Sequence, residues 1–227
     1  LASLHDLRRG AFASRTIKRG SKIATADVFF AIPLGEGQVT ANDWSKYTEY
    51  VAKSDIKAGA PLRFSDVRKV DNREKVYDIV RSVNAFLSES GVVVPGEADL
   101  EISHHYGIDR FRESGTTMIT VVNREYCKKL IILLPGQKHP EQYHKKKEET
   151  FHVLYGELTI SLNGEEKRIG RGDIFVVEKG KKHSFSTKGG AVIEEISSTH
   201  WKEDSYYTDP AIARNKNRKT FLTYWMG

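Results

Sequence analysis

Four side chains in the carboxyl-terminal half of this 227-residue sequence have the types and spacing of metal ligands. They are Gln142, His144, Glu149 and His183. Two imidazoles, a carboxylate and an amide oxygen suit a first-row divalent ion such as Zn, Mn, Fe or Ni. Because alternate side chains of an extended strand share a face, Gln142 and His144 should point the same way. The sequence therefore predicts one divalent metal site.

Glu195 is the candidate catalytic base. With Ser197 and Thr199 it forms the polar face of a predicted strand, whereas Val192 and Ile196 lie on the other face. A bound metal can polarise a carbonyl, and a carboxylate within reach can then remove a proton from the adjacent carbon. Interconversion of aldoses and ketoses needs this chemistry. The alternative is that Glu195 forms a buried ion pair with one of the many lysines.

Turn signals predict the strands that must position these residues. After Gly156, an alternating run over 157–162 meets Asn163-Gly164, the strongest short hairpin signal. The segment from Gly172 to His183 is typical of a turn, a short apolar strand and a second turn that delivers His183. The remaining histidines of this half are predicted not to be ligands: His104, His105, His139, His152 and His200.

These motifs resemble the cupin superfamily. The first cupin motif is matched by Gly136, Gln142, His144, Glu149 and Gly156, with Gln142 at the place of the usual first histidine, and the second by Gly172, Gly180 and His183. The resemblance covers about residues 95–210 and implies a small jelly-roll β-barrel with a mononuclear metal. The stretches 148–156 and 195–199 look especially like lyxose-isomerase-type sugar cupins.

The first seventy residues contain an approximate internal repeat. A segment of the form Ala-x-x-x-Ile-Lys-x-Gly, over 13–20 and again over 52–59, is followed by an apolar residue and a polar-Asp-Val step. Glycine turns in such repeats predict a small, loop-rich β unit. Residues 5–68 resemble the SAF or antifreeze-like domain, the β-clip module of sialic acid synthases. The sugar-contacting arginine of that family would fall at residues 32–34, where this chain has Ile-Pro-Leu.

A helix is predicted between the two units. Apolar residues recur at three-and-four spacing from Val76 to Leu87, Asn72 is a plausible cap and Gly91 ends the pattern. The predicted fold is therefore mainly β, with an SAF β-clip domain over 1–70, a helical linker over 71–92 and a cupin jelly-roll barrel (a double-stranded β-helix) with a basic tail over 93–227.

Composition narrows the classes of protein. No apolar run has the length of a membrane span and no amino-terminal signal is present, so no membrane partner and a cytoplasmic location are expected. The lone Cys127 fits a reducing compartment and a structural role. The net charge of +6 arises from basic clusters that include Lys145, Lys146 and Lys147. We interpret them as a solvated rim, and expect no nucleic acid partner because no recognition motif accompanies them.

The two resemblances together predict the carboxyl-terminal part of a sialic-acid-synthase-like protein of bacterial surface-sugar (nonulosonic acid) biosynthesis. The cupin would be a metal-binding, isomerase-like or epimerase-like domain that acts on a sugar or sugar acid, and a homodimer is expected. The alternative is a non-catalytic sugar-binding and dimerisation module, accessory to an absent synthase barrel. The missing arginine and the substituted first ligand favour the alternative, whereas His144, Glu149 and His183 favour the enzyme.

Overall fold

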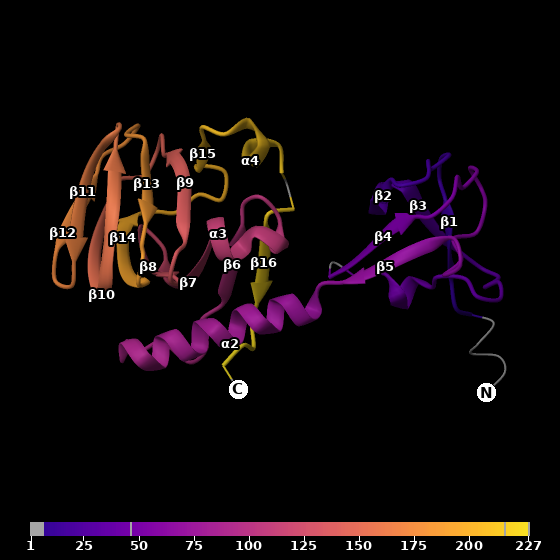
Figure 1. Ribbon diagram of the computed structural model, residues 1–227, viewed down its shortest axis with the longest axis horizontal. Coiled ribbons are helices and arrows are strands. Elements are labelled where there is room, and N and C mark those ends of the chain that lie inside the picture. Colours follow the sequence, from indigo (N-terminus) through magenta and orange to yellow (C-terminus); the bar gives the residue numbers. More distant parts are fainter. Residues whose placement is uncertain (1–6, 46, 216, 227) are drawn as a thin grey trace. The chain divides into compact units, whose positions relative to one another are not determined.

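The computed structural model describes residues 7–45, 47–215 and 217–226. Its contacts divide the chain into two compact units, Leu1–Val76 and Tyr77–Gly227 (Figure 1). Both are built mainly from β-strands, as the sequence predicted. No helix in the described part of the chain is long and apolar enough to cross a membrane.

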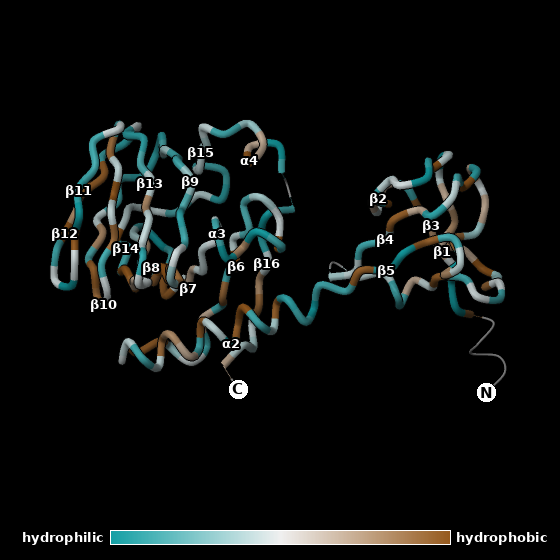
Figure 2. Tube along the Cα trace, viewed as in Figure 1, coloured by the Kyte–Doolittle hydropathy of each residue, from teal (hydrophilic) through white to brown (hydrophobic). Residues whose placement is uncertain are grey.

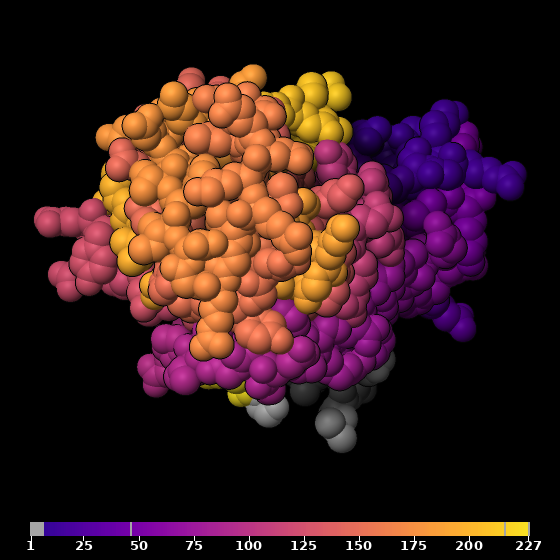
Figure 3. Space-filling model, turned by 60° about the vertical axis from the view of Figure 1, so that its left-hand side comes forward, coloured from indigo at the N-terminus to yellow at the C-terminus, as the bar shows by residue number. Residues whose placement is uncertain are grey.

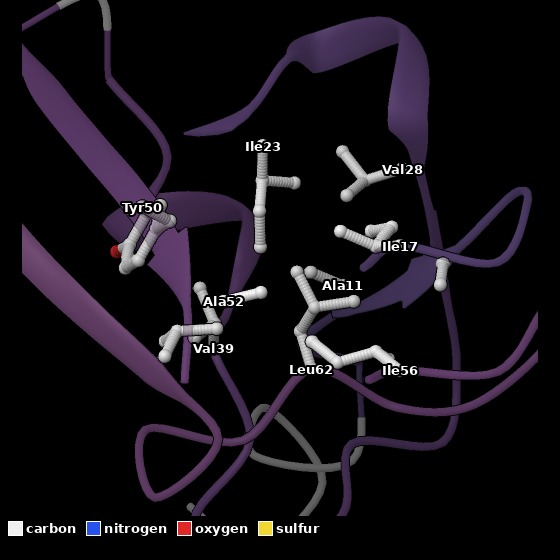
Figure 4. Packing of buried hydrophobic residues seen from close by; sticks show 11 residues of the cluster. Ala11, Ile17, Ile23, Val28, Val39, Tyr50, Ala52, Ile56 and Leu62 are labelled. Carbon is white, nitrogen blue, oxygen red and sulfur yellow. The ribbon is translucent and has the colours of Figure 1, made fainter. Parts of the chain in front are cut away.

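The amino-terminal unit is a small β structure with long loops. Its strands are β1 (Gly10–Ala13), β2 (Lys22–Ile23), β3 (Val28–Ala31), β4 (Thr48–Ala52) and β5 (Val67–Asp71), and the 3-10 helices η1 (Thr25–Asp27) and η2 (Ala41–Asp43) lie between them. Strand β1 pairs with β3, and β4 lies between β2 and β5. Figure 4 shows the apolar side chains that fill the centre of this unit, among them Ile17, Ile56 and Leu62.

The internal repeat seen in the sequence is a structural repeat. Ile17 and Ile56, which occupy equivalent positions in the two copies, pair through two backbone hydrogen bonds of 2.8 Å each. Both side chains are buried in the same core. Each copy then turns at a glycine with positive φ, Gly20 at 80° and Gly59 at 77°, a conformation that glycine adopts without steric cost.

Helix α2 (Arg73–Ser90) is the helix predicted from the apolar periodicity. Asn72 stands at its N-cap, since its backbone carbonyl accepts the N–H of Val76. The Asn72 side chain does not cap, however, because its Oδ1 has no hydrogen-bond partner in the described part of the chain. The carboxylate of Asp71 accepts the N–H of Arg73 at 3.0 Å instead.

The carboxyl-terminal unit is one strongly curled sheet. Its strands are β6 (Leu100–His104), β7 (Gly115–Asn123), β8 (Tyr126–Leu133), β9 (Lys138–Tyr143), β10 (Glu149–Leu162), β11 (Glu165–Gly170), β12 (Ile174–Val177), β13 (His183–Ser186), β14 (Ala191–Ser198), β15 (Tyr206–Tyr207) and β16 (Lys219–Leu222). The strand order is β15-β9-β13-β10-β14-β8-β7-β6-β16, and β11 and β12 also pair with β10. Three short helices complete the unit: η3 (Ile108–Arg110), α3 (Phe111–Ser114) and α4 (Pro210–Arg214).

Within this unit, α2 lies along one edge of the barrel (Figure 3). Hydrophobic residues recur in short steps along the helix (Figure 2), and those on its inner face, such as Val83 and Phe86, are buried. The Phe86 ring makes an edge contact with Tyr155, with the ring centres 5.6 Å apart. The periodic apolar face of α2 therefore packs against the barrel.

Strand β10 bends in the middle and so serves two parts of the sheet. Its first half pairs with β12 and β14 and its second half with β11 and β13. Gly156 lies at the bend with a φ of 73°, and a Cβ there would come within 2.1 Å of the Gly190 carbonyl oxygen. The predicted hairpin follows, with Asn163 and Gly164 both at positive φ between paired Leu162 and Glu165.

Candidate metal centre

The four predicted ligands converge inside the barrel. The nearest ligand atoms of His144, Glu149 and His183 all lie within 4.8 Å of one another, and all three residues are buried. The two carboxylate oxygens of Glu149 each lie 3.3 Å from one histidine Nε2, that of His144 and that of His183. The Gln142 amide group is 3.5 Å from His183 Nε2. In the described part of the chain, no other group of three such side chains is this close.

Strand register brings these residues together from distant parts of the sequence. Gln142 on β9 is the cross-strand partner of His183, the first residue of β13. Glu149 is the first residue of β10. The sequence predicted His144 on the same strand as Gln142, and this was wrong. β9 ends at Tyr143, so His144 lies directly after the end of the strand.

Unpaired polar atoms indicate that the cluster fits a cation. Gln142 Oε1, His144 Nε2 and Glu149 Oε2 are buried, and none has a hydrogen-bond partner among the residues that the structure describes. Buried polar atoms are rarely left unpaired, because their desolvation costs about 1–3 kcal/mol each. Three such atoms on the predicted ligands are donors of the types that suit a divalent metal.

Hydrogen bonds from Nδ1 orient the imidazole rings of His144 and His183. His144 Nδ1 donates to the backbone carbonyl of Asp204, and His183 Nδ1 donates to that of Lys181 at 3.1 Å. In a neutral imidazole the proton then sits on Nδ1 and leaves a lone pair on Nε2. Burial lowers the pKa of His183, which favours this neutral form.

Asp204 organises the loop between His144 and Glu149. Its carboxylate accepts the backbone N–H groups of Lys145, Lys146 and Lys147 at 3.0 to 3.2 Å, while its carbonyl holds His144. Asp204 is fully enclosed although it lies 60 residues beyond His144 in the chain. Sequence reasoning missed this residue, because an aspartate in a polar loop has no local signal of such a role.

Lys147 corrects the prediction that its cluster is a solvated rim. Its side chain is 3% exposed, and Nζ lies 2.5 Å from Glu149 Oε1 and 2.8 Å from Glu195 Oε1. Burial would lower the pKa of Lys147, but Glu195 and Glu149 outweigh it and raise the pKa. Lys145 and Lys146 do lie near the surface, where their ammonium groups cover the rings of Tyr206 and Trp201.

Glu195 lies in the same cavity and forms the ion pair that the sequence left as an alternative. Besides Lys147, it accepts a hydrogen bond from Ser197 Oγ at 3.0 Å. Burial by itself would raise the pKa of Glu195, but the ammonium groups of Lys147 and Lys129 lower it overall. The carboxylate is therefore ionised at neutral pH and able to accept a proton.

The cavity beside these residues is small and polar. Residues that line it away from the candidate ligands include Glu101, Thr116, Lys129, His139, His200, Tyr207 and Lys219. The side chains leave a volume of about 30 Å³, which holds no more than a few water molecules. His139 and His200, which the sequence did not predict to be ligands, line the cavity but are not part of the group His144, Glu149 and His183.

Two family models match the two units separately. Residues 8–68 match the SAF domain and residues 129–196 match the cupin domain. A D-lyxose/D-mannose isomerase of Thermosediminibacter oceani is 27% identical over 183 residues, which cover 67% of this chain and 96% of that protein. A D-lyxose ketol-isomerase of Cohnella laeviribosi is 26% identical over 171 residues, 63% of this chain and 91% of that protein.

Solved structures agree on the fold of the barrel. L-ribose isomerase of Cellulomonas parahominis superposes with a TM-score of 0.53 over 62% of this chain and 94% of that protein, at 15% identity. At this identity the likeness shows a shared fold. The chain thus combines an SAF domain with a mainly β cupin domain, and the cupin part is related in sequence to D-lyxose isomerases.

Proposed function

We propose that the cupin domain is a metal-dependent sugar isomerase or epimerase. The observation that carries this proposal is the convergence of Gln142, His144, Glu149 and His183. Gln142 Oε1, His144 Nε2 and Glu149 Oε2 are buried with no hydrogen-bond partner among the described residues. An ionised carboxylate, Glu195, lies in the same cavity. A ligand set and a base are the two components that proton transfer beside a sugar carbonyl requires.

Each residue then has a definite task. When bound, the metal would polarise the sugar carbonyl as a Lewis acid. In isomerisation, Glu195 takes the proton from the carbon beside the carbonyl and returns it to the former carbonyl carbon, while the hydroxyl proton of the first carbon moves to the former carbonyl oxygen. In epimerisation, the proton returns to the opposite face of the same carbon. The ammonium of Lys147 and the hydroxyl of Ser197 hold the Glu195 carboxylate in place, and Asp204 holds the loop that carries His144.

The wider context is part of the same proposal. We assign the chain to a sialic-acid-synthase-like protein of nonulosonic acid biosynthesis, working in the cytoplasm as a homodimer. The SAF match over residues 8–68 supports this context, since the repeat resembles the module of those synthases.

A second candidate function is sugar binding without catalysis. It is favoured by the position of Lys147, whose ammonium already neutralises Glu149 and Glu195. The small cavity favours it as well, because a sugar enters only if side chains move. In this alternative the buried ion pairs stabilise the barrel and chemistry takes place elsewhere.

Exchange of substrate protons with deuterium oxide distinguishes the two functions. Metal-loaded chain is incubated with a panel of aldoses, ketoses and nonulosonic acid precursors, and proton NMR follows the signal beside the carbonyl. We expect exchange that disappears in Glu195→Gln while metal content is unchanged. Glu178→Gln is the matched control, because Glu178 is exposed. Binding of several sugars with no exchange would establish the accessory function.

A further inference from the structure

Lys129 is a charged residue of the cavity that has no assigned contact in the proposed reaction. Lys129 on β8 is 4% exposed and lines the cavity. It is the cross-strand partner of Glu195 on β14, so the two side chains project from the same face of the sheet. No ion pair or hydrogen bond joins the Lys129 ammonium to any residue that the structure describes.

The other two lysines of the cavity differ from Lys129 in this respect. Lys147 contacts both Glu149 and Glu195, and Lys219 pairs with Glu101 at 2.7 Å. A buried ammonium is stable when it is paired and hydrogen-bonded, and is costly when it is not. An unpaired buried lysine that faces a ligand cavity is therefore a candidate partner for a negative group on the ligand.

The charge balance of the cavity leads to the same result. Three lysines (Lys129, Lys147, Lys219) face three carboxylates (Glu101, Glu149, Glu195), so the cavity walls are neutral as a whole. A divalent cation on the predicted ligands adds two positive charges to this neutral set. The loaded cavity then favours an anionic ligand over an uncharged one.

A second polar group lines the same cavity as Lys129. The His200 ring lines the cavity, and its Nδ1 is buried with no hydrogen-bond partner in the described part of the chain. Burial and, after it, the Lys129 ammonium lower the pKa of His200. An ammonium and an imidazole N–H together can hold the two oxygens of one carboxylate.

We propose that the substrate is an acidic sugar whose carboxylate is bound by Lys129 and His200, while its carbonyl end faces His144, Glu149 and His183. This inference rests on the proposed function, because it concerns the same cavity. It adds the substrate class, a sugar acid in place of a neutral pentose or hexose. A planar carboxylate also suits so small a cavity better than a bulkier phosphate group.

Calorimetric titration of the metal-loaded full chain tests the preference directly. D-glucuronate is compared with D-glucose and D-galacturonate with D-galactose, pairs that differ in one carboxylate, and D-glucose 6-phosphate is the phosphate arm. We expect each sugar acid to bind at least tenfold more tightly than its neutral counterpart and more tightly than the phosphate ester. Equal binding of the paired sugars, or tighter binding of the phosphate ester, would overturn the proposal.

Variants of two adjacent lysines locate the anion site. Lys129→Gln should remove the preference for the carboxylate and leave neutral sugars unaffected, and Lys129→Arg should keep it because the charge remains. Lys128→Gln is the matched control. Lys128 directly precedes Lys129 on β8 and forms an ion pair with Glu194 on the other face of the strand. A preference that survives in a folded Lys129→Gln, or that Lys128→Gln also removes, would refute the role of Lys129.

The two proposals fail in different ways. Carboxylate preference is an equilibrium binding measurement and does not depend on turnover. Proton exchange with no carboxylate preference would leave the isomerase function standing and reject the acidic substrate. Carboxylate preference without proton exchange would leave the acidic ligand standing and reject the isomerase function.

Discussion

The two units of this chain place their charged side chains in opposite ways. In the described part of the amino-terminal unit, Asp27 is the one buried carboxylate, and its partner Arg15 reaches it from the surface at 2.7 Å. The carboxyl-terminal unit encloses Lys129, Lys147, Glu149 and Glu195 within its barrel. Since burial of charge opposes folding, we expect the functional site in the barrel interior and not in the amino-terminal unit.

Asp27 shows what a buried charge does when its role is structural. Its second oxygen accepts the N–H of Ala24 at 2.9 Å, so the carboxylate closes the η1 turn as well as pairing with Arg15. Every atom of the group has a local partner. In the barrel, by contrast, Gln142 Oε1, His144 Nε2 and Glu149 Oε2 have no hydrogen-bond partner among the described residues. This is the difference that we expect between a structural charge and a binding site.

The largest expected effect is loss of the metal. His144→Ala and His183→Ala should each abolish binding of about one divalent ion per chain, because an imidazole ligand is removed from a closed set. Gln142→Ala should only weaken binding, since an amide oxygen is a poor donor. Elemental analysis after dialysis measures the metal content, with His152→Ala as the control on the outer face of β10. Unchanged metal in His144→Ala would contradict the site.

The comparison predicts a different response in the amino-terminal core. Leu62 is fully buried there, and Leu62→Ala should destabilise that unit by about 2–5 kcal/mol through the cavity it leaves. Metal content should remain that of the unaltered chain. Hydrogen exchange of the full chain reports each unit separately, and Ile32→Ala, an exposed change in the same unit, is the control. Loss of metal in Leu62→Ala would show that the units are not independent.

Acid should destabilise the barrel before the amino-terminal unit. Burial lowers the pKa of His105 and of His200 to about 4, whereas both ionise near 6.5 when unfolded. Their contribution to stability is complete above about pH 6.5 and is lost as the pH falls towards 4. A shift of this size corresponds to at most about 3 kcal/mol for each histidine.

The amino-terminal unit serves as the internal reference for that titration. Its described residues contain no histidine, and its shifted acidic groups are aspartates with pKa values lowered from 3.8. The pKa values of Lys18 and Tyr50 are raised from 10.5 and 10.0, far above the range of this titration. Chelated samples are followed by hydrogen exchange from pH 7 to pH 4.5. Equal loss of protection in both units would contradict the assignment of neutral, buried histidines.

Asp204 supports the metal site indirectly, so its removal should have a smaller effect. Asp204→Asn keeps the size of the side chain but loses the carboxylate that holds Lys145, Lys146 and Lys147. Metal affinity should fall about 10- to 100-fold, as is usual for residues that orient ligands. A competitive titration with a chelator measures the change. Glu203→Gln, at the adjacent exposed position, should leave the affinity unaltered.

The smallest effect is expected for a surface ion pair. Glu49 lies 2.6 Å from the Lys22 ammonium on the amino-terminal unit, and the side chains of Lys22 and Glu49 are 62% and 36% exposed. Glu49→Gln should change the free energy of unfolding by less than about 1 kcal/mol, because solvent screens such pairs. Denaturant unfolding measures this. A larger loss would contradict the screening of this ion pair by solvent.

Local features of the sequence determined the turns and the helix, and they predicted which residues converge. Gly156, Asn163 and Gly164 adopt the positive φ angles that their turns need, and the apolar period over residues 76–87 produced the helix. The two repeats of the amino-terminal unit were visible for the same reason, since each copy contains its own turn. The convergence of Gln142, His144, Glu149 and His183 was likewise predictable from their residue types and the turns between them, although His144 follows the end of β9.

Only the tertiary structure decided which charged residues face the cavity. Lys145, Lys146 and Lys147 are identical in type, yet the loop held by Asp204 turns Lys147 inwards and leaves its neighbours on aromatic rings at the surface. Lys128 and Lys129 differ in the same way, through the pairing of β8 with β14. The residue type does not tell whether a lysine side chain faces the cavity or the surface. Its direction depends on strand register and on partners about 60 residues away in the chain.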